Sequence, residues 1–334
     1  MQAQQAATML HEGLKPSGGL PIGDLRGFGR VRADAALACL SLDRSKPALA
    51  SSRVDRSLLL LDVDGDVVWD QAYVPGTNVI ESTGRIGAAE LRVVDFMALA
   101  EGRPGQGDAV AAGRFVRIVT CTEGEVTFRL TCGLAVDAAP GLEGRTVDGA
   151  YVACSHLLDF SDECASASVH LRAGQSAALV IAAAPLDGGP ALIADTLHGL
   201  GDTIHYWTWW SDRCRYKGED FDERLRDVLA LKLACATGAG MICERPGTHG
   251  YAPAPLGECS RAAARFLALG YRQECVDLLS HVHVQSVEVD AASWGADEAF
   301  VSTLAHYTER YGEAGLPPAL RHAALPQTDP LRAV

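Results

Sequence analysis

The sequence predicts a β-sandwich followed by an all-α domain, and three observations lead to that prediction. The chain has 334 residues, 48% of them hydrophobic, which is enough for two domains of roughly 100 to 200 residues each. Up to about residue 185, short apolar runs alternate with turns rich in Gly, Asp and Pro, a pattern typical of antiparallel strands. From about residue 191 the apolar period becomes helical. Strands therefore come first and helices second.

The strand region begins with its clearest local signal, the pair Asp64-Gly65 between the runs 58–63 and 66–69. Asp-Gly is a preferred sequence of the two-residue type I′ turn, because both central residues need a positive φ. We therefore predict a hairpin here. Further strands are predicted at 91–97, 115–121, 125–136, 150–160, 167–171 and 177–183. So many antiparallel strands in succession favour a sandwich.

The helical region follows with five predicted helices separated by Gly and Pro breaks. They span residues 192–214, 222–236, 258–269, 272–284 and 296–311. The chain accordingly divides into a β-sandwich at 20–188, a helical linker at 189–220, an all-α domain at 221–316 and a C-terminal tail at 317–334. We expect the tail, which contains Pro326 and Pro330, to be loosely held.

The charge of the chain argues against two classes of partner. It has 29 Lys and Arg against 42 Asp and Glu, a net charge of −13, and phosphate backbones and anionic lipid surfaces both require basic patches. We expect no nucleic-acid partner and no membrane partner. The sequence has no leader-like pattern and no run of 18 apolar residues. With ten cysteines and no C-x-x-C pair, it predicts a cytoplasmic protein with buried, reduced thiols.

Several strings, in this order and spacing, resemble glycoside hydrolase family 15, the bacterial glucoamylase and trehalase-like group. They are IGDLR at 22–26, YVPGTNVIEST at 73–83, VVDFM at 93–97, WTWWSDRCRYKG at 207–218 and LRDVLALKLACATGA at 225–239. The resemblance implies an N-terminal β-sandwich, a helical linker and the first helices of an (α/α)6 barrel. The predicted helical domain would then be a partial α/α toroid.

The resemblance also implies a hydrolytic chemistry in which two glutamates of the barrel cleave an α-glucosidic bond with inversion. Twelve helices with their loops need on the order of 200 residues, whereas residues 225–334 number 110. The family's two glutamates lie in the middle and last thirds of the barrel. We therefore expect a truncated relative without them.

The early sugar-binding motif of the family is also altered. The string LGYRQE at 269–274 matches the end of the barrel's second helix, which places residues 255–258 on the family's Trp-Leu-Arg-Asp. Glu258 keeps a carboxylate there, but Gly257 replaces the arginine. His249 and Tyr251 lie on the preceding motif. The predicted substrate-binding groups are therefore four residues: His249, Tyr251, Glu258 and Trp294, the last of which lies in a predicted loop.

The segment after residue 280 carries an His-x-His pair. In an extended segment, His281 and His283 would lie on one face, near Glu288 and Asp290, and such groups can hold zinc. Two histidines without a clearly spaced third ligand are more often surface or core groups, so we predict neither a metal nor a cofactor.

Two functional hypotheses follow. The first is a carbohydrate-related binding or assembly module, for a small-molecule or carbohydrate ligand, which forms a homo-oligomer or associates with a partner protein that covers the helical face. The second is an enzyme, either a minimal α-glucosidase or a repurposed scaffold, with Glu258 as acid and His281 or His283 as proton shuttle. Its further carboxylates would come from Glu288, Asp290, Asp297 and Glu298.

Overall fold

The computed structural model describes residues 19–53, 55, 57–100, 110–136, 138–161, 163–235, 243–247, 250–288 and 298–324. The chain forms two compact units. The first, here the β unit, comprises residues 1–211 and 245–251, and the second, here the helical unit, comprises residues 212–244 and 252–334. Each unit is described by itself. A β domain is thus followed by a helical part, in the order that the sequence predicts.

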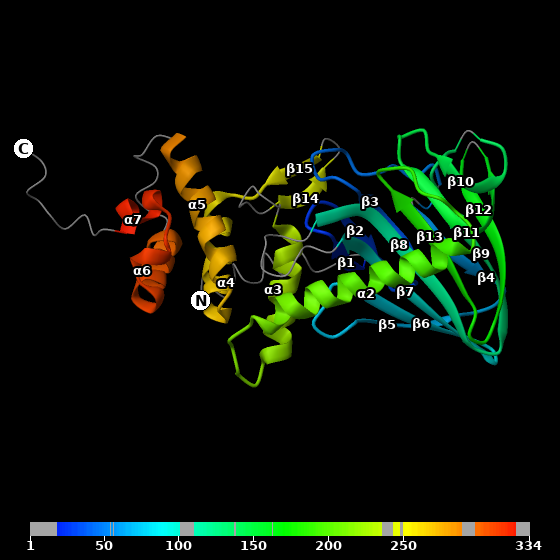
Figure 1. Ribbon diagram of the computed structural model, residues 1–334, viewed down its shortest axis with the longest axis horizontal. Helices are drawn as coiled ribbons and strands as arrows, with labels where there is room; N and C mark the ends of the chain where they lie inside the picture. Colours follow the sequence, from blue (N-terminus) through cyan, green and yellow to red (C-terminus); the bar gives the residue numbers. More distant parts are fainter. Residues whose placement is uncertain are drawn as a thin grey trace, which may run out of the picture. The chain divides into compact units, whose positions relative to one another are not determined.

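The β unit is built on one antiparallel sheet of thirteen strands (Figure 1). The strands are β1 (Leu20–Gly23), β2 (Phe28–Val31), β3 (Leu37–Ser41), β4 (Leu59–Val63), β5 (Val68–Tyr73), β6 (Ile80–Ile86), β7 (Ala89–Ala100), β8 (Val110–Glu123), β9 (Glu125–Cys132), β10 (Gly141–Arg145), β11 (Tyr151–Phe160), β12 (Ala165–Arg172) and β13 (Ser176–Ala182). Their order is β1-β2-β3-β4-β9-β12-β11-β13-β8-β7-β6-β5, and β10 pairs with β11.

Strand β11 connects the two halves of this sheet. Its residues 151–154 pair with β13, whereas Asp159 and Phe160 pair with β12. The sheet therefore curls on itself, and one apolar cluster collects side chains from both halves, such as Leu130 of β9 and Val119 of β8. Successive side chains of a strand point to opposite faces of the sheet, so one face can supply the cluster. In β12, for example, buried residues alternate with exposed or half-buried ones.

Helix α2 (Ala191–Asp212) covers the opposite face of the strands β7, β8 and β13. Leu192 and Ile204 pack there against Phe96 and Val116. The helix is also tied to the sheet by hydrogen bonds: the Thr203 hydroxyl accepts the amide N–H of Leu99 at 3.1 Å. Both faces of this half of the sheet are thus buried.

The predicted hairpin at Asp64-Gly65 is wrong. Strand β4 pairs with β3 and β9, and strand β5 pairs with β6, so residues 64–67 connect strands in opposite halves of the sheet. Gly65 does adopt a positive φ of 112°. Asp64 does not, so the turn is not of type I′. The pairing of the flanking strands follows burial against distant strands.

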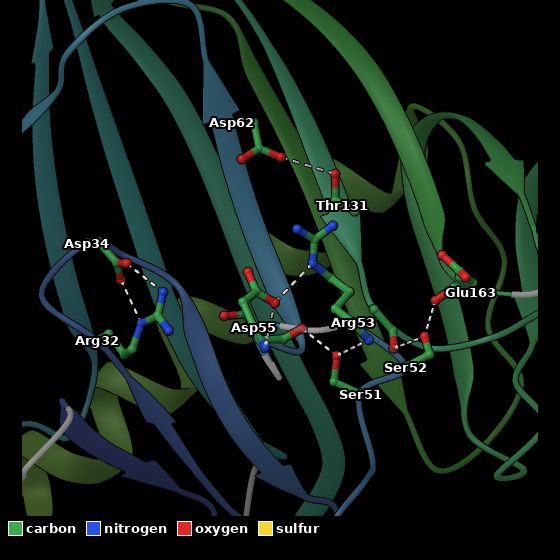
Figure 2. A network of polar contacts seen from close by, with 11 residues as sticks. Arg32, Asp34, Ser51, Ser52, Arg53, Asp55, Asp62, Thr131 and Glu163 are labelled. Carbon is green, nitrogen blue, oxygen red and sulfur yellow. Dashed lines mark hydrogen bonds and ion pairs between the residues drawn. The ribbon is translucent and has the colours of Figure 1, made fainter.

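A network of polar contacts ties the connection between β3 and β4 to the sheet (Figure 2). The Ser52 hydroxyl donates to the carbonyl oxygens of Gly133, at 2.9 Å, and Glu163. Nε of Arg53 donates to Asp55 at 3.2 Å. In this network each arginine lies beside an aspartate two residues away, as Arg32 does beside Asp34 at 2.6 Å.

The helical unit contains α3 (Phe221–Ala234), α4 (Leu256–Leu269), α5 (Arg272–Glu288), α6 (Glu298–Tyr311), the 3₁₀ turn η2 (Glu313–Gly315) and α7 (Pro318–Ala324). Helix α4 packs against α5 and α6. The strands β14 (Cys243–Gly247) and β15 (Gly250–Pro253) form a separate two-stranded ladder. Residues 318–324, expected as part of a loosely held tail, form a helix in which Leu320 is fully buried.

Three further properties concern the described residues only. Within the ranges given above, none of the helices has the length and apolar character needed to cross a bilayer. The same ranges contain no group of three His, Cys, Asp or Glu side chains that could hold a metal ion. Nine cysteines with described side chains are free thiols, and burial raises the pKa of Cys132 and Cys275 to about 12.

Candidate functional site

The helical unit contains an open cavity of about 540 Å³, a size within the usual range of small-molecule sites. We call it the arginine pocket. Its wall comes from the segment after α2, the α4–α5 junction, α6 and η2. The lining residues are Asp212, Arg213, Arg215, Gly270, Arg272, Gln273, Val276, Tyr307 and Gly315.

The junction between α4 and α5 shapes one side of this pocket. Helix α4 ends at Gly270, which has a φ of 94°, and the N–H of Tyr271 donates to the carbonyl of Phe266 at 2.9 Å. This is a Schellman cap, which favours glycine because a side chain is strained at positive φ. The N–H of Arg215 donates to the carbonyl of Leu269 at 2.8 Å. That bond joins the segment after α2 to the end of α4.

A buried carboxylate supports the wall from behind. Glu274 is 6% exposed and accepts from Nη2 of Arg213 at 2.8 Å, while Nζ of Lys232 lies 3.4 Å from its other oxygen. The Arg213 guanidinium also lies 5.8 Å from the ring centre of Tyr271. Burial, with the nearby Cys214 and Glu274, raises the pKa of Tyr271. Arg213 is therefore neutralised and fixed in place.

Arg272, the first residue of α5, is held by aromatic rings. Its guanidinium carbon lies 4.3 Å from the ring centre of Tyr311 and 5.8 Å from that of Tyr307, distances typical of cation–π contacts. Nη2 of Arg272 also donates to the Tyr307 hydroxyl at 3.3 Å. Within the described part of the chain, no carboxylate lies at ion-pair distance from Arg272 or from Arg215.

The electrostatic character of the pocket differs from that of the chain. Three arginines line it against one carboxylate, Asp212, although the whole protein carries a net charge of −13. Glycosidic hydrolysis by acid and base requires two carboxyl groups that face the same bond. Among the described residues, the wall supplies one carboxyl group, that of Asp212.

Glu258 lies away from this pocket, in the first turn of α4. Its carboxylate forms an ion pair with Arg261, three residues further along the same helix, and its side chain is 19% exposed. The contact is local, of a kind that stabilises helix termini. Among the described residues, no hydrogen bond or ion pair joins Glu258 to His281 or His283.

His281 and His283 both lie in α5, within the helix predicted over 272–284, so the extended segment that would put them on one face does not form. Residues two apart on a helix differ in direction by about 200°, so the two imidazoles do not share a face. Partial burial lowers the pKa of His281. Neither histidine lines the arginine pocket.

The other predicted site residues are largely outside the described residues. These are His249, Trp294, Asp290 and Asp297. For Tyr251 in β15 and Glu288 at the end of α5, the backbone is described and the side chain is not. Glu298 begins α6 and is exposed. Of the predicted carboxylates, only Glu258 and Glu298 have a described side chain.

Sequence reasoning missed the arginine pocket, although two of its strings contained the residues. Asp212, Arg213 and Arg215 belong to the string at 207–218, and Arg272 and Gln273 belong to LGYRQE at 269–274. Both strings were used to recognise a resemblance. The available signal was the recurrence of Arg within them, in a chain that is otherwise acidic.

Comparisons with known proteins leave the family open. No family model matches the chain, and no curated protein does. Among solved structures, one described as "Putative kojibiose phosphorylase from human microbiome" aligns with a TM-score of 0.45 and 8% sequence identity. The alignment covers 85% of this chain and 47% of that one, so the chain spans about half the length of that structure. A similarity of this size identifies neither a family nor an activity.

Proposed function

We propose that the protein is a carbohydrate-related binding module whose ligand occupies the arginine pocket. The observation that carries this proposal is the composition of the wall. Guanidinium groups, the Gln273 amide and the Tyr307 hydroxyl converge on a space of about 540 Å³, and such groups hydrogen-bond to sugar hydroxyls. Only one carboxylate, Asp212, is among them. The resemblance of the sequence to family 15 glycoside hydrolases, with a partial α/α toroid, supports a saccharide as the ligand class.

Calorimetric titration of the full chain with a panel of saccharides tests this proposal. The panel contains glucose, maltose and trehalose, together with the charged sugars glucose 6-phosphate and glucuronate. We expect at least one saccharide to bind, and a Gln273→Ala variant to bind it several-fold more weakly. Failure of every saccharide to bind would contradict the proposal.

A hydrolysis assay with maltose and trehalose separates the binding module from the enzyme. We expect no turnover, because the described wall of the pocket contains one carboxylate, Asp212, and this hydrolysis needs two. Turnover by the parent protein that a Glu258→Gln variant loses would overturn the binding-module proposal. It would mean that Glu258 acts with a second carboxylate.

Assembly with a second copy or a partner protein belongs to the same proposal. A second hollow of about 530 Å³ lies between α4 and α6, and Ala264, Leu267 and Ala268 provide its apolar wall. Exposed apolar surface favours association when it forms a contiguous patch. Light scattering across a range of concentrations tests self-association, and a monomer at every concentration would contradict a homo-oligomer.

A further inference from the structure

We propose that the ligand of the arginine pocket carries an anionic group, a phosphate or a carboxylate, which Arg215 and Arg272 bind. This inference rests on the proposed function for the sugar part of the ligand. The anion part stands on the pocket alone. It follows from the pairing of the arginines, from the cavity that both of them line and from the position of α5.

Pairing distinguishes these two arginines from Arg213. Glu274 forms an ion pair with Arg213 at 2.8 Å, so the Arg213 guanidinium already has a carboxylate partner. Arg215 and Arg272 have no such carboxylate among the described residues. A guanidinium offers five N–H donors, suited to bidentate contact with phosphate or carboxylate. Of the five donors of Arg272, one contacts the Tyr307 hydroxyl.

Two glycines lie against these arginine side chains, one beside the aliphatic stem of Arg215 and one beside the guanidinium group of Arg272. A Cβ at residue 270 would lie 2.9 Å from Cγ of Arg215, and a Cβ at residue 315 would lie 2.8 Å from Nη2 of Arg272. Both glycines line the cavity. Larger residues at positions 270 and 315 would displace the two arginine side chains. Glycine at both positions therefore leaves these side chains in place.

Helix α5 adds a third source of positive potential. Its first two residues, Arg272 and Gln273, both line the pocket. The N-terminus of a helix carries a partial positive charge and amide donors, which favour anions. The helix has 17 residues, and its N-terminus lies at the same cavity as the two arginines without carboxylate partners.

The test compares four probes by calorimetry on the full chain: glucose, glucose 6-phosphate, glucuronate and inorganic phosphate. We expect the two charged sugars to bind at least tenfold more tightly than glucose, and their affinity to fall with added salt. Arg215→Gln and Arg272→Gln should each weaken the binding of the charged sugars about tenfold, a larger loss than that of glucose binding.

Arg310→Gln is the matched control, because the Arg310 guanidinium also lies 5.4 Å from the Tyr311 ring centre but does not line this pocket. It should leave the affinity of the charged sugars unchanged. Circular dichroism and thermal melting establish that each variant is folded. An Arg272→Lys variant, which keeps the charge, should recover part of the lost affinity. Equal losses in Arg310→Gln and Arg272→Gln would contradict the assignment of the anion to Arg272.

The outcomes separate the two proposals. Glucose binding as tightly as glucose 6-phosphate would overturn the anionic ligand and support the saccharide module. Inorganic phosphate binding in the absence of any sugar binding would support the anion site and overturn the saccharide module. No binding of any probe would overturn both. A preference for glucose 6-phosphate over glucuronate would identify the anion as a phosphate, and the reverse preference would identify it as a carboxylate.

Discussion

In the β unit, the Arg117 guanidinium is fully buried and bonds to both oxygens of Asp95, at 2.8 and 2.7 Å, and to the carbonyl of Ala35. In the helical unit, Arg215 and Arg272 are exposed on the wall of a cavity and have no carboxylate at ion-pair distance among the described residues. The same side chain therefore has two roles. A paired, buried arginine specifies the fold, whereas an arginine with free donors at a cavity is available to a ligand.

The polar network of Figure 2 is an intermediate case. Arg32 and Arg53 are each about one-third exposed, and each pairs with an aspartate two residues away. These pairs are local and partly solvated, so each contributes at most about 1 kcal/mol. Exposure alone does not make an arginine available to a ligand, because pairing already uses its donors.

The largest expected effect is that of removing Arg117. An Arg117→Met variant leaves the Asp95 carboxylate buried without its cation, which costs about 3–5 kcal/mol of unfolding free energy. Chemical denaturation measures this loss. The double variant with Asp95→Leu should recover much of it, since no buried charge is then left. A loss below about 1 kcal/mol for Arg117→Met would mean that the buried pair does not specify the fold.

The second effect concerns Glu274, a buried carboxylate that pairs with Arg213 on the wall of the arginine pocket. Glu274→Gln removes the buried carboxylate that pairs with Arg213 and Lys232, and because Arg213 is one-third exposed we expect a loss of about 2 kcal/mol. The pocket gains positive charge at the same time. Its affinity for the charged sugars should therefore rise, as calorimetry at low salt would show. A weaker affinity would contradict this account of Arg213.

A smaller effect is the pH dependence that Asp43 introduces in the β unit. Burial raises its pKa, but hydrogen bonds from Ser45 and Arg26 outweigh burial and lower the pKa to about 2. An aspartate in the unfolded chain titrates near 3.9. The stabilisation is therefore complete above about pH 4 and is lost as the pH falls toward 2.

Because Arg26 is 58% exposed, we expect this contribution to be about 1 kcal/mol. Denaturation of the parent protein and of Asp43→Asn at pH 5, 4 and 3 measures it. The difference in unfolding free energy between the two should be constant above pH 4 and shrink below it. A difference that grows toward low pH would contradict the sign.

The smallest expected effect on stability is that of removing Arg215. Arg215→Gln removes an exposed cation without an ion-pair partner among the described residues, so stability should change by no more than about 0.5 kcal/mol. The same measurement on Arg32→Gln should give a loss of up to about 1 kcal/mol, since Arg32 pairs with Asp34 at 2.6 Å. A large loss for Arg215→Gln would mean that this arginine is structural.

Much of the secondary structure was predictable from the sequence. Six strands, predicted from 91–97 to 177–183, correspond to β7, β8, β9, β11, β12 and β13, and five helices correspond to α2 through α6. The periods of two and of 3.6 residues depend on which face is buried, so they are visible along the chain. Short or edge strands give weaker signals. In β5, for example, exposed residues alternate with half-buried ones, and none is fully buried.

The candidate site was much less predictable. Glu258 was singled out from its place in a motif, but its nearest charged partner is Arg261 on the same helix. The arginine pocket instead joins residues near 213 with residues near 272 and 307. Nothing in the local pattern indicates that these segments meet, because the contact depends on the cap at Gly270 and on the packing of α4 against α5 and α6.

The order of strands and helices and the approximate extent of each helix were predictable from the sequence, since both depend on neighbouring residues. The tertiary structure alone decided which strands pair across Asp64-Gly65, which arginines obtain a carboxylate partner and which face a cavity. Whether a residue is buried or paired depends on residues that are distant from it along the chain. Arg117 and Arg272 are the same residue type, and only their surroundings give one a structural role and the other free donors.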